Sequence, residues 1–261
     1  MDQSPASQTL HWPDYDGALF DLDGVITDTA EIHATCWKRM FDDYLRQRAM
    51  REGTEFRPFD IATDYRNYVD GRPRHDGVRT FLASRGIELP EGTPEDSAEQ
   101  ETIQGLGRRK NKFVLEAIQA GQVKVYDTSV EYVKALLEAG KCVGIVTSSA
   151  NCDEVLRSVD LLDLFPVRID GRTIVERNLQ GKPAPDAFIA GAEALDSPPI
   201  RLVVFEDAIS GVQAGRNGAF GCVVGVARHE NAEQLRSHGA DVVVADLAEL
   251  NEPLPGGGRP A

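Results

Sequence analysis

Apolar residues in this chain gather in short, nearly continuous runs that predict buried β-strands. Neither face of such a strand meets water, so the alternation of apolar and polar positions is lost. Five runs of this kind occur, at 17–21, 142–147, 201–206, 221–226 and 241–246. Amphipathic segments with helical spacing separate most of them, at 129–139, 151–158, 186–195 and 208–217. Alternating strands and helices predict an α/β fold with a doubly wound parallel sheet.

The first two predicted strands lie too far apart for a single helical crossover, and the block between them has a different pattern. It shows helical spacing but no convincing strand, with helices expected at 31–45, 76–85 and 105–120. Its stretch 88–102 is rich in Pro, Gly and acids, which predicts a loop. We therefore expect a helical cap domain at 29–123, inserted into a core domain made of 1–28 and 124–261.

Charge and composition narrow the classes of partner. The chain has 261 residues and a formal net charge of −14 at pH 7, so its surface should repel nucleic acids and anionic lipids. No apolar run approaches the roughly 18 residues that a membrane span requires. The first residues lack the basic and apolar parts of a secretory signal. We expect a cytoplasmic monomer that binds neither nucleic acid nor membrane, with positive charge gathered locally for any anionic substrate.

The four cysteines are widely spaced and form no C-x-x-C pair. This spacing argues against a zinc site and against a disulfide scaffold. We interpret Cys36, Cys142, Cys152 and Cys222 as small buried hydrophobic residues.

Acids and hydroxyls follow three of the predicted strands at the point where each strand ends. They are Asp21, Asp23, Thr147, Ser148, Glu206 and Asp207. A lone D-x-D pair is more simply an exposed turn. Here, however, the carboxyl ends of parallel strands meet at one edge of the sheet, where ligands bind. Several acids in one cleft require a cation, and hard oxygen ligands favour Mg²⁺.

A lysine in a stiff loop supplies the other charge. Lys182 lies in "QGKPAPDAF", where Pro183 and Pro185 restrict the backbone, so we favour a functional role over a solvated surface lysine. The loop lacks the upstream glycine of a phosphate-binding Walker A motif. Gly211 and Gly215 fall on a predicted helix and are more simply explained by close packing.

These motifs together resemble the haloacid dehalogenase superfamily of phosphotransferases. Its four signatures occur in order, as "DLDGVITDT", the strand end at Thr147, "GKPAPD" and "VVFEDAISGVQAG". The position of the inserted block resembles the subgroup with a helical cap after the first motif. Within that subgroup, "DLDGVITDTAEIH", "VDGRPRHDG" and "RRKN" resemble the β-phosphoglucomutase-like enzymes, whereas generic phosphatases more often carry "DGTLVDSE".

The resemblance implies a role for each core residue. Asp21 would be the nucleophile that forms an aspartyl phosphate, and Asp23 the general acid and base. Thr147 would hydrogen-bond the transferring phosphoryl group, and Lys182 would neutralise it.

The resemblance also implies a set of ligands for Mg²⁺. Asp21, the backbone carbonyl of Asp23, and Asp207 would hold the ion, with Glu206 assisting.

In the cap, the resemblance assigns Arg74 to a distal phosphate and Lys110 to the substrate. A guanidinium suits the first task because its planar fork matches phosphate oxygens. Arg72 stays open between a functional and a solvated role, whereas Arg108 and Arg109 are expected on a solvated helix face.

His33 and Trp37 lie four residues apart and so share a helix face. A core aromatic beside a partly exposed histidine is the plainer interpretation. The resemblance instead puts His33 near Asp23, where it would gate that acid, and leaves Trp37 evenly balanced between core and sugar contact.

The stretch after the second strand resembles the family's phosphate loop. It adds Ser148, Ser149 and Asn151 as substrate contacts. Ala150 departs from the family, in which lysine is common at this position. The segment 45–61 also departs, because it is longer and more charged than a minimal cap requires.

The activity that the resemblance implies is interconversion of β-D-glucose 1-phosphate and glucose 6-phosphate, through an aspartyl phosphate and β-glucose 1,6-bisphosphate. Two alternatives stay open: a sugar-phosphate phosphatase of the same fold, and a catalytically idle binding protein. Reorientation of the intermediate requires the cap to open, so hinges are expected near 27–30 and 123–127.

Overall fold

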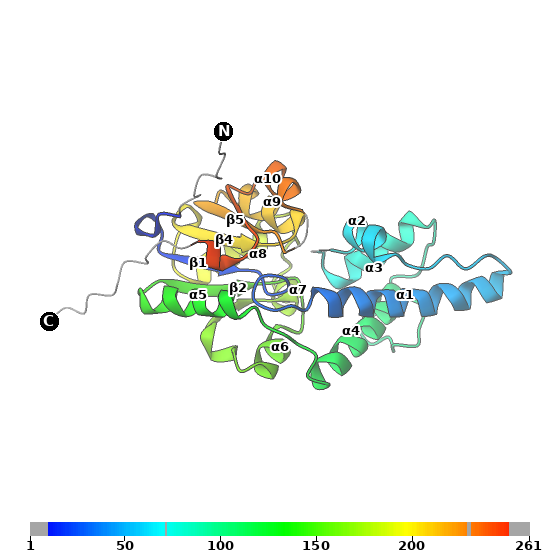
Figure 1. The fold of residues 1–261 in the computed structure, drawn as a ribbon. Coiled ribbons are helices and arrows are strands. Elements are labelled where there is room, and N and C mark those ends of the chain that lie inside the picture. Colours follow the sequence, from blue (N-terminus) through cyan, green and yellow to red (C-terminus); the bar gives the residue numbers. More distant parts are fainter. Residues whose placement is uncertain (1–9, 71, 229–230, 251–261) are drawn as a thin grey trace.

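The computed structural model describes residues 10–70, 72–228 and 231–250 (Figure 1). Six parallel strands form one sheet in the order β3-β2-β1-β4-β5-β6. They are β1 (Gly17–Phe20), β2 (Cys142–Val146), β3 (Val167–Ile169), β4 (Leu202–Glu206), β5 (Cys222–Val226) and β6 (Val242–Val244). Sequence order reverses on either side of β1, so the predicted doubly wound α/β class is confirmed.

Helices cover both faces of the sheet, which explains why β1, β2, β5 and β6 carry no charged side chain. Ala18 and Phe20 of β1 pack into one apolar cluster with α5 (Asp127–Glu138) and α6 (Cys152–Ser158). Leu19 points the other way, into a cluster that includes side chains from α8 (Asp186–Ala194) and α9 (Ile209–Asn217). Figure 1 shows α5 and α6 below the sheet, with α9 and α10 (Ala232–Ser237) above it.

Three elements of the core escape sequence prediction: β3, α7 (Gly171–Glu176) and α10. All are short, and β3 carries Arg168, whose Nε donates to Asp153 at 2.9 Å. An edge strand of three residues, of which only Ile169 is fully buried, has too little apolar pattern to be recognised. Short 3₁₀ turns complete the core, at Trp12–Asp14, Leu162–Leu164, Pro199–Arg201 and Leu247–Glu249. The ends of the predicted core elements differ from the observed ones by at most two residues.

The inserted block is helical, and no strand occurs among its described residues. It contains α1 (Ala30–Glu52), a π-helical turn (Ile61–Tyr65), α2 (Arg66–Tyr68), α3 (Arg74–Ser84) and α4 (Ile103–Gln119). Its core is aromatic: the Phe41 ring lies 5.3 Å from Trp37, 5.1 Å from Phe59 and 4.2 Å from Phe81, measured between ring centroids. Figure 1 shows this body beside the sheet, at one end of the molecule.

The segment 45–61 is partly a continuation of α1, which runs well beyond the predicted end at residue 45. The helix ends at Gly53, whose φ of +66° is the left-handed conformation that glycine adopts readily. Leu45, Ala49 and Phe59 are buried, so part of this charged segment builds the cap's own core.

The chain passes from the sheet domain into the helical block near residue 28 and returns near residue 124, and these two crossings are hydrogen-bonded to each other. The backbone N–H of Asp28 donates to the carbonyl of Lys124, and that of Tyr126 to Ile26, both at 2.9 Å. The Tyr126 hydroxyl also donates to Asp28 at 3.3 Å. Both crossings therefore form one narrow connection.

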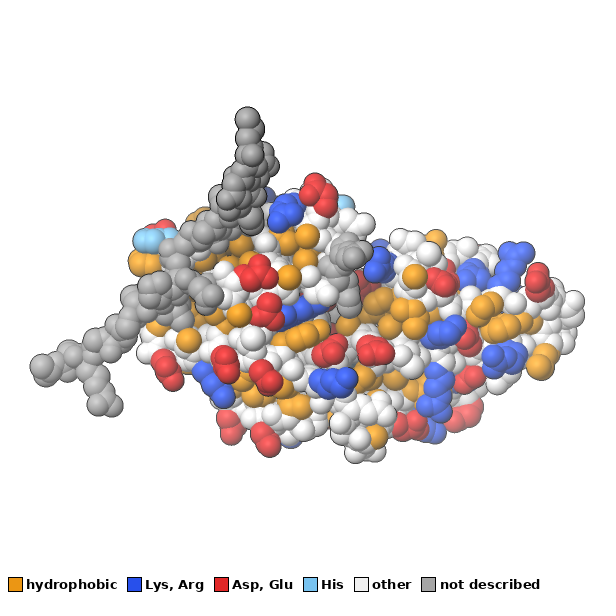
Figure 2. Space-filling model, in the orientation of Figure 1, with side chains coloured by type: hydrophobic (Ala, Val, Ile, Leu, Met, Phe, Trp, Pro, Cys, Tyr) orange, Lys and Arg blue, Asp and Glu red, His pale blue; other side chains and the backbone are white. Residues whose placement is uncertain are grey.

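The surface and the cysteines partly follow expectation. On the face in Figure 2, acidic and basic side chains are interspersed, with several basic ones over the helical body. Three of the four cysteines are buried, as predicted. Cys142 is only partly buried, so the prediction is wrong for it, because it is the first residue of β2. Within the described ranges, no helix has the length and apolar character of a transmembrane span.

Candidate active site

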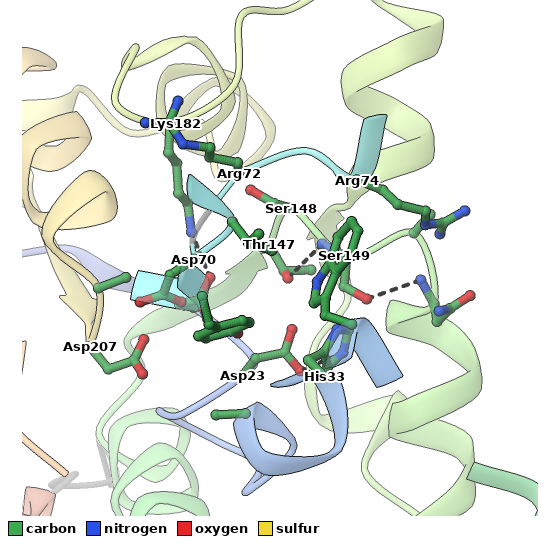
Figure 3. A pocket seen from close by; sticks show the side chains of 18 of the residues that line it. Asp23, His33, Asp70, Arg72, Arg74, Thr147, Ser148, Ser149, Lys182 and Asp207 are labelled. Carbon is green, nitrogen blue, oxygen red and sulfur yellow. Dashed lines mark hydrogen bonds and ion pairs between the residues drawn. The ribbon is translucent and has the colours of Figure 1, made fainter. Parts of the chain in front are cut away.

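A pocket lies where the carboxyl ends of the strands face the helical body, and residues from both bodies line it (Figure 3). Every site residue expected from the sequence is among its lining. They are Asp21, Asp23, His33, Trp37, Arg74, Lys110, Thr147, Ser148, Ser149, Asn151, Lys182, Glu206 and Asp207. Segments far apart in the chain therefore converge on one place.

Lys182 forms the centre of the charged network. Its Nζ donates to Oδ1 of Asp21 at 2.5 Å, to the carbonyl of Val146 at 3.2 Å, and to Oε1 of Glu206. Burial opposes the ammonium, but the charges of Asp21 and Glu206 outweigh it and raise the pKa of Lys182. The lysine is therefore a permanent cation. Because its side chain is buried, the alternative of a solvated surface lysine is wrong.

Asp21 directly follows β1 and is held there by its backbone N–H, which donates to Phe205 at 2.9 Å. Burial raises the pKa of Asp21 well above its usual value; Lys182 opposes this shift, whereas Glu206 adds to it. The carboxyl is thus desolvated, and Lys182 is the one cation among the described residues that pairs with it.

Two glycines allow the acids to approach the backbone. A Cβ on Gly211 would lie 1.8 Å from Oε1 of Glu206, which confirms that this glycine serves close packing. The other Glu206 oxygen accepts from the N–H of Ala208 at 3.0 Å. A Cβ on Gly24, whose φ is +92°, would lie 2.0 Å from Oδ2 of Asp207. Both motif glycines are therefore required by geometry.

Negative charge exceeds positive charge at this end of the pocket. Burial raises the pKa of Asp207 well above its usual range, and the charges of Glu206 and Asp21 raise it further. Of the described basic residues, Lys182 alone forms ion pairs with these acids, with Asp21 and Glu206. The described residues include no group of three or more His, Cys, Asp or Glu side chains arranged to hold a metal. A cation here would need backbone or substrate oxygens as well.

Asp23 lies at the junction of the two bodies. Its Oδ1 accepts a hydrogen bond from the Thr29 hydroxyl and lies 3.5 Å from Nε2 of His33. Thr29 is itself 2.9 Å from the hydroxyl of Thr27. The first residues of the crossing therefore position the second acid.

His33 and Lys110 are a buried pair of bases. Lys110 Nζ lies 2.7 Å from Nδ1 of His33 and 5.1 Å from the centre of the Trp37 ring. Burial, with the Lys110 charge, lowers the pKa of His33 to about 4. Burial, with the Arg74 charge, lowers the pKa of Lys110 to about 7. His33 is thus neutral. When Lys110 is an ammonium it can only donate to Nδ1, which leaves the imidazole proton on Nε2, the atom that lies 3.5 Å from Asp23.

Arg74 begins α3 on the opposite side of the pocket from Asp207 (Figure 3). Burial lowers its pKa to about 10, and the charges of Arg172 and Arg108 add to the effect. Among the described residues, no carboxylate forms an ion pair with Arg74. Desolvated positive charge without a carboxylate is suited to an anionic ligand.

The other arginines of the cap differ in whether they reach the pocket. Arg72 lines the pocket, whereas Arg108 and Arg109 do not. Arg108 is exposed and donates to the carbonyl of Pro94, and Arg109 donates to Ala98 at 2.6 Å. The solvated-face interpretation holds for Arg108 but is incomplete for Arg109, which is partly buried against the loop.

The loop after β2 is a compact series of turns. Thr147 Oγ1 accepts from the N–H of Ser149 at 3.0 Å, and Ser149 Oγ accepts from the N–H of Asn151 at 3.3 Å. Asn151 Nδ2 then donates to Oδ1 of Asn111 at 2.8 Å. A Cβ on Gly171 would lie 2.7 Å from the carbonyl oxygen of Ser148, so α7 packs tightly behind the loop.

Sequence reasoning missed three residues of this region: Tyr65, Asp70 and Asn111. Tyr65 and Asp70 line the pocket, and Figure 3 shows Asp70 near Asp207. Asp70 and Asn111 lie within stretches that carry the family resemblance, but neither residue type nor spacing marks them as pocket residues.

Comparison with known proteins agrees with this geometry. The chain is 52% identical over 235 residues to a protein of Mycobacterium bovis named beta-phosphoglucomutase, covering 89% of this chain and 90% of the relative. A Bacillus subtilis protein of the same name is 30% identical over 234 residues, covering 89% of this chain and 90% of the relative. The crystal structure of a beta-phosphoglucomutase from Clostridium difficile matches with a TM-score of 0.70 at 22% identity, covering 91% of this chain and 93% of that one.

That structural match shows the fold, and the sequence matches show the family. The family model for haloacid dehalogenase-like hydrolases matches residues 15–218, which include the sheet residues of the site and the helical block. The chain therefore belongs to the haloacid dehalogenase-like hydrolase family.

Proposed function

We propose that this protein is a β-phosphoglucomutase that interconverts β-D-glucose 1-phosphate and glucose 6-phosphate. A relative that is 52% identical along nearly its whole length carries that name. The observation that carries the proposal is the two-ended pocket, with Asp21 and Lys182 at one end and Arg74 at the other. A substrate with two phosphates would present one to each end.

In the proposed reaction, a carboxylate oxygen of Asp21 attacks phosphorus, and the bond from phosphorus to the sugar oxygen breaks. Asp23 gives a proton to that leaving oxygen and later removes one from the attacking sugar hydroxyl. Lys182 holds the other Asp21 oxygen in place, and Thr147 lies beside the reacting group. Neutral His33, with its Nε2 proton towards Asp23, would orient that acid.

The cap residues complete the substrate site in this proposal. Arg74 would bind the distal phosphate, with Ser148, Ser149 and Asn151 from the core loop. Lys110 and Trp37 would contact the sugar. Transfer to the second hydroxyl requires β-glucose 1,6-bisphosphate to turn around, so the cap domain, 29–123, would open at the paired crossings near 27–30 and 123–127.

We also propose Mg²⁺ as the cofactor, because the excess of buried carboxylates fits a hard cation. Asp21 and Asp207 would hold it together with the backbone carbonyl of Asp23. Glu206 already accepts from Lys182 and Ala208, so it would assist by fixing the lysine. When bound, the ion would offset negative charge on the transferring phosphoryl group.

We propose a cytoplasmic monomer that binds a small sugar phosphate. The free state of all four cysteines supports a reducing compartment.

A coupled assay tests the proposed function. Formation of glucose 6-phosphate from β-D-glucose 1-phosphate is measured with and without β-glucose 1,6-bisphosphate, alongside release of inorganic phosphate. The mutase is expected to be strongly activated by the bisphosphate and to prefer the β-anomer over α-glucose, maltose and trehalose phosphates. Steady phosphate release without activation would instead favour a sugar-phosphate phosphatase. This is the second candidate, because the matching family is named for hydrolases.

A further inference from the structure

The helical body and the core are joined at the pocket by a hydrogen bond between two asparagines. Asn151 Nδ2, in the loop after β2, donates to Oδ1 of Asn111 on α4 at 2.8 Å. Asn151 is buried and lines the pocket, whereas Asn111 lies just outside its lining. The bond therefore crosses between the two bodies next to the proposed distal-phosphate site.

Asn151 forgoes a local hydrogen bond to make this contact. It is the N-cap residue of α6, a position at which asparagine normally accepts from an N–H of the first turn. No such side-chain bond is present here, and Nδ2 of the amide donates instead to Asn111. The Asn151 side chain is thus engaged with α4 and not with its own helix.

Asn111 also shares its helix turn with a residue of the pocket. The adjacent Lys110 lies 2.7 Å from His33, which in turn faces Asp23. A second contact between the bodies lies at the lysine loop, where a Cβ on Gly181 would be 2.4 Å from Cγ of Pro73. The Asn111 bond therefore fixes the middle turn of α4, which carries Lys110, in an arrangement where the bodies are in contact.

We propose that Asn111 is a positioning residue that holds the cap domain over the pocket through Asn151, and so retains the bisphosphate between the two phosphoryl transfers. The inference rests on the proposed function. The Asn151 Nδ2 carries two N–H donors, so one can hold Asn111 while the other meets a phosphate beside Arg74. Occupancy of the distal site is thereby coupled to closure of the cap.

The test compares Asn111→Leu, which keeps the volume but loses the acceptor, with Asn111→Asp, which keeps an acceptor oxygen. Lys112→Ala is the matched control, because Lys112 lies next to Asn111 and is exposed on the same helix. The readouts are the β-glucose 1,6-bisphosphate concentration for half-maximal mutase activity and the amount of bisphosphate released per turnover. Hydrolysis of p-nitrophenyl phosphate is followed in parallel.

A single hydrogen bond of this kind predicts about a two- to tenfold rise in the half-maximal bisphosphate concentration for Asn111→Leu. The kcat at saturating bisphosphate should fall less, and Asn111→Asp should stay within about twofold of the wild type. Lys112→Ala should match the wild type. Equal values for Asn111→Leu and Lys112→Ala would overturn the proposal.

Hydrogen exchange of the ligand-free protein separates failure of this inference from failure of the proposed function. Asn111→Leu should speed amide exchange at 148–151 and in α4 relative to Lys112→Ala, whether or not the wild type is a mutase. Unchanged exchange would refute the role of Asn111 in holding the cap domain, whereas a wild type without mutase activity would refute only the proposed function.

Discussion

The Nζ atom of Lys182 lies 2.5 Å from Oδ1 of Asp21 and donates at the same time to Glu206, with all three side chains nearly inaccessible to solvent. One buried ammonium thus serves two buried carboxylates that come from neighbouring strands, β1 and β4. Removal of one partner from such a group leaves the others uncompensated.

Lys182→Met should therefore lower the free energy of unfolding by about 3 kcal/mol at pH 7. Without the lysine, the pKa of Asp21 should rise further in the folded state, so the folded variant binds more protons than the folded wild type. The stability difference should consequently widen as the pH rises from 5 to 8. Urea denaturation at several pH values measures this, with exposed Lys112→Met as the control; a difference independent of pH would contradict the coupling.

Arg74→Met should separate the two ends of the pocket. Loss of the distal-phosphate contact is expected to reduce kcat/KM for the mutase reaction by about 10- to 100-fold. Hydrolysis of p-nitrophenyl phosphate, which has no second phosphate, should change far less. The melting temperature should not fall, because burial already disfavours this guanidinium. Arg108→Met, outside the pocket, is the control. Equal losses for both substrates would mean that Arg74 supports the fold.

Lys110 should impose a pH dependence on stability. Its pKa is lowered to about 7 by burial and by Arg74, whereas an unfolded lysine titrates near 10.5. Between these values the unfolded chain binds more protons, so stability rises with pH. The wild type should gain up to about 1.4 kcal/mol per pH unit over Lys110→Met in that window. Chemical denaturation at pH 7, 8 and 9 measures the gain, and parallel curves for both proteins would exclude it.

Magnesium should stabilise the protein through Asp207. At Mg²⁺ concentrations about 100-fold above the dissociation constant, the melting temperature should rise by about 5 °C. Asp207→Asn should abolish this rise and should itself be more stable than the metal-free wild type, because a buried like charge is removed. Glu233→Gln, on an exposed side chain, should respond as the wild type does. A full magnesium shift in Asp207→Asn would place the ion elsewhere.

The sequence predicts the core of the site well because parallel strands bring their carboxyl ends to one edge. Asp21, Thr147 and Glu206 each follow or end a recognisable apolar run, so their convergence follows from topology alone. Strand β3 is not recognisable, since it has three residues and its Arg168 pairs with Asp153.

The contacts between the two bodies could not be predicted in the same way. The bond from Asn151 to Asn111 and the approach of Asp70 to the pocket depend on how the helical block lies against the sheet. Apolar periodicity determines which face of α4 is buried but not the distance of its middle turn from a loop of the core. The His33–Lys110 contact is likewise a result of packing between α1 and α4.

The most direct test of the account is chemical trapping of the phosphorylated enzyme. The protein is mixed with β-glucose 1,6-bisphosphate and Mg²⁺, quenched, and treated with borohydride, which reduces an acyl phosphate to an alcohol. Mass spectrometry of the peptides should then find homoserine at position 21, and Asp21→Asn should give neither this product nor turnover. Homoserine at another aspartate, or full turnover by Asp21→Asn, would contradict the assignment of Asp21 as the nucleophile.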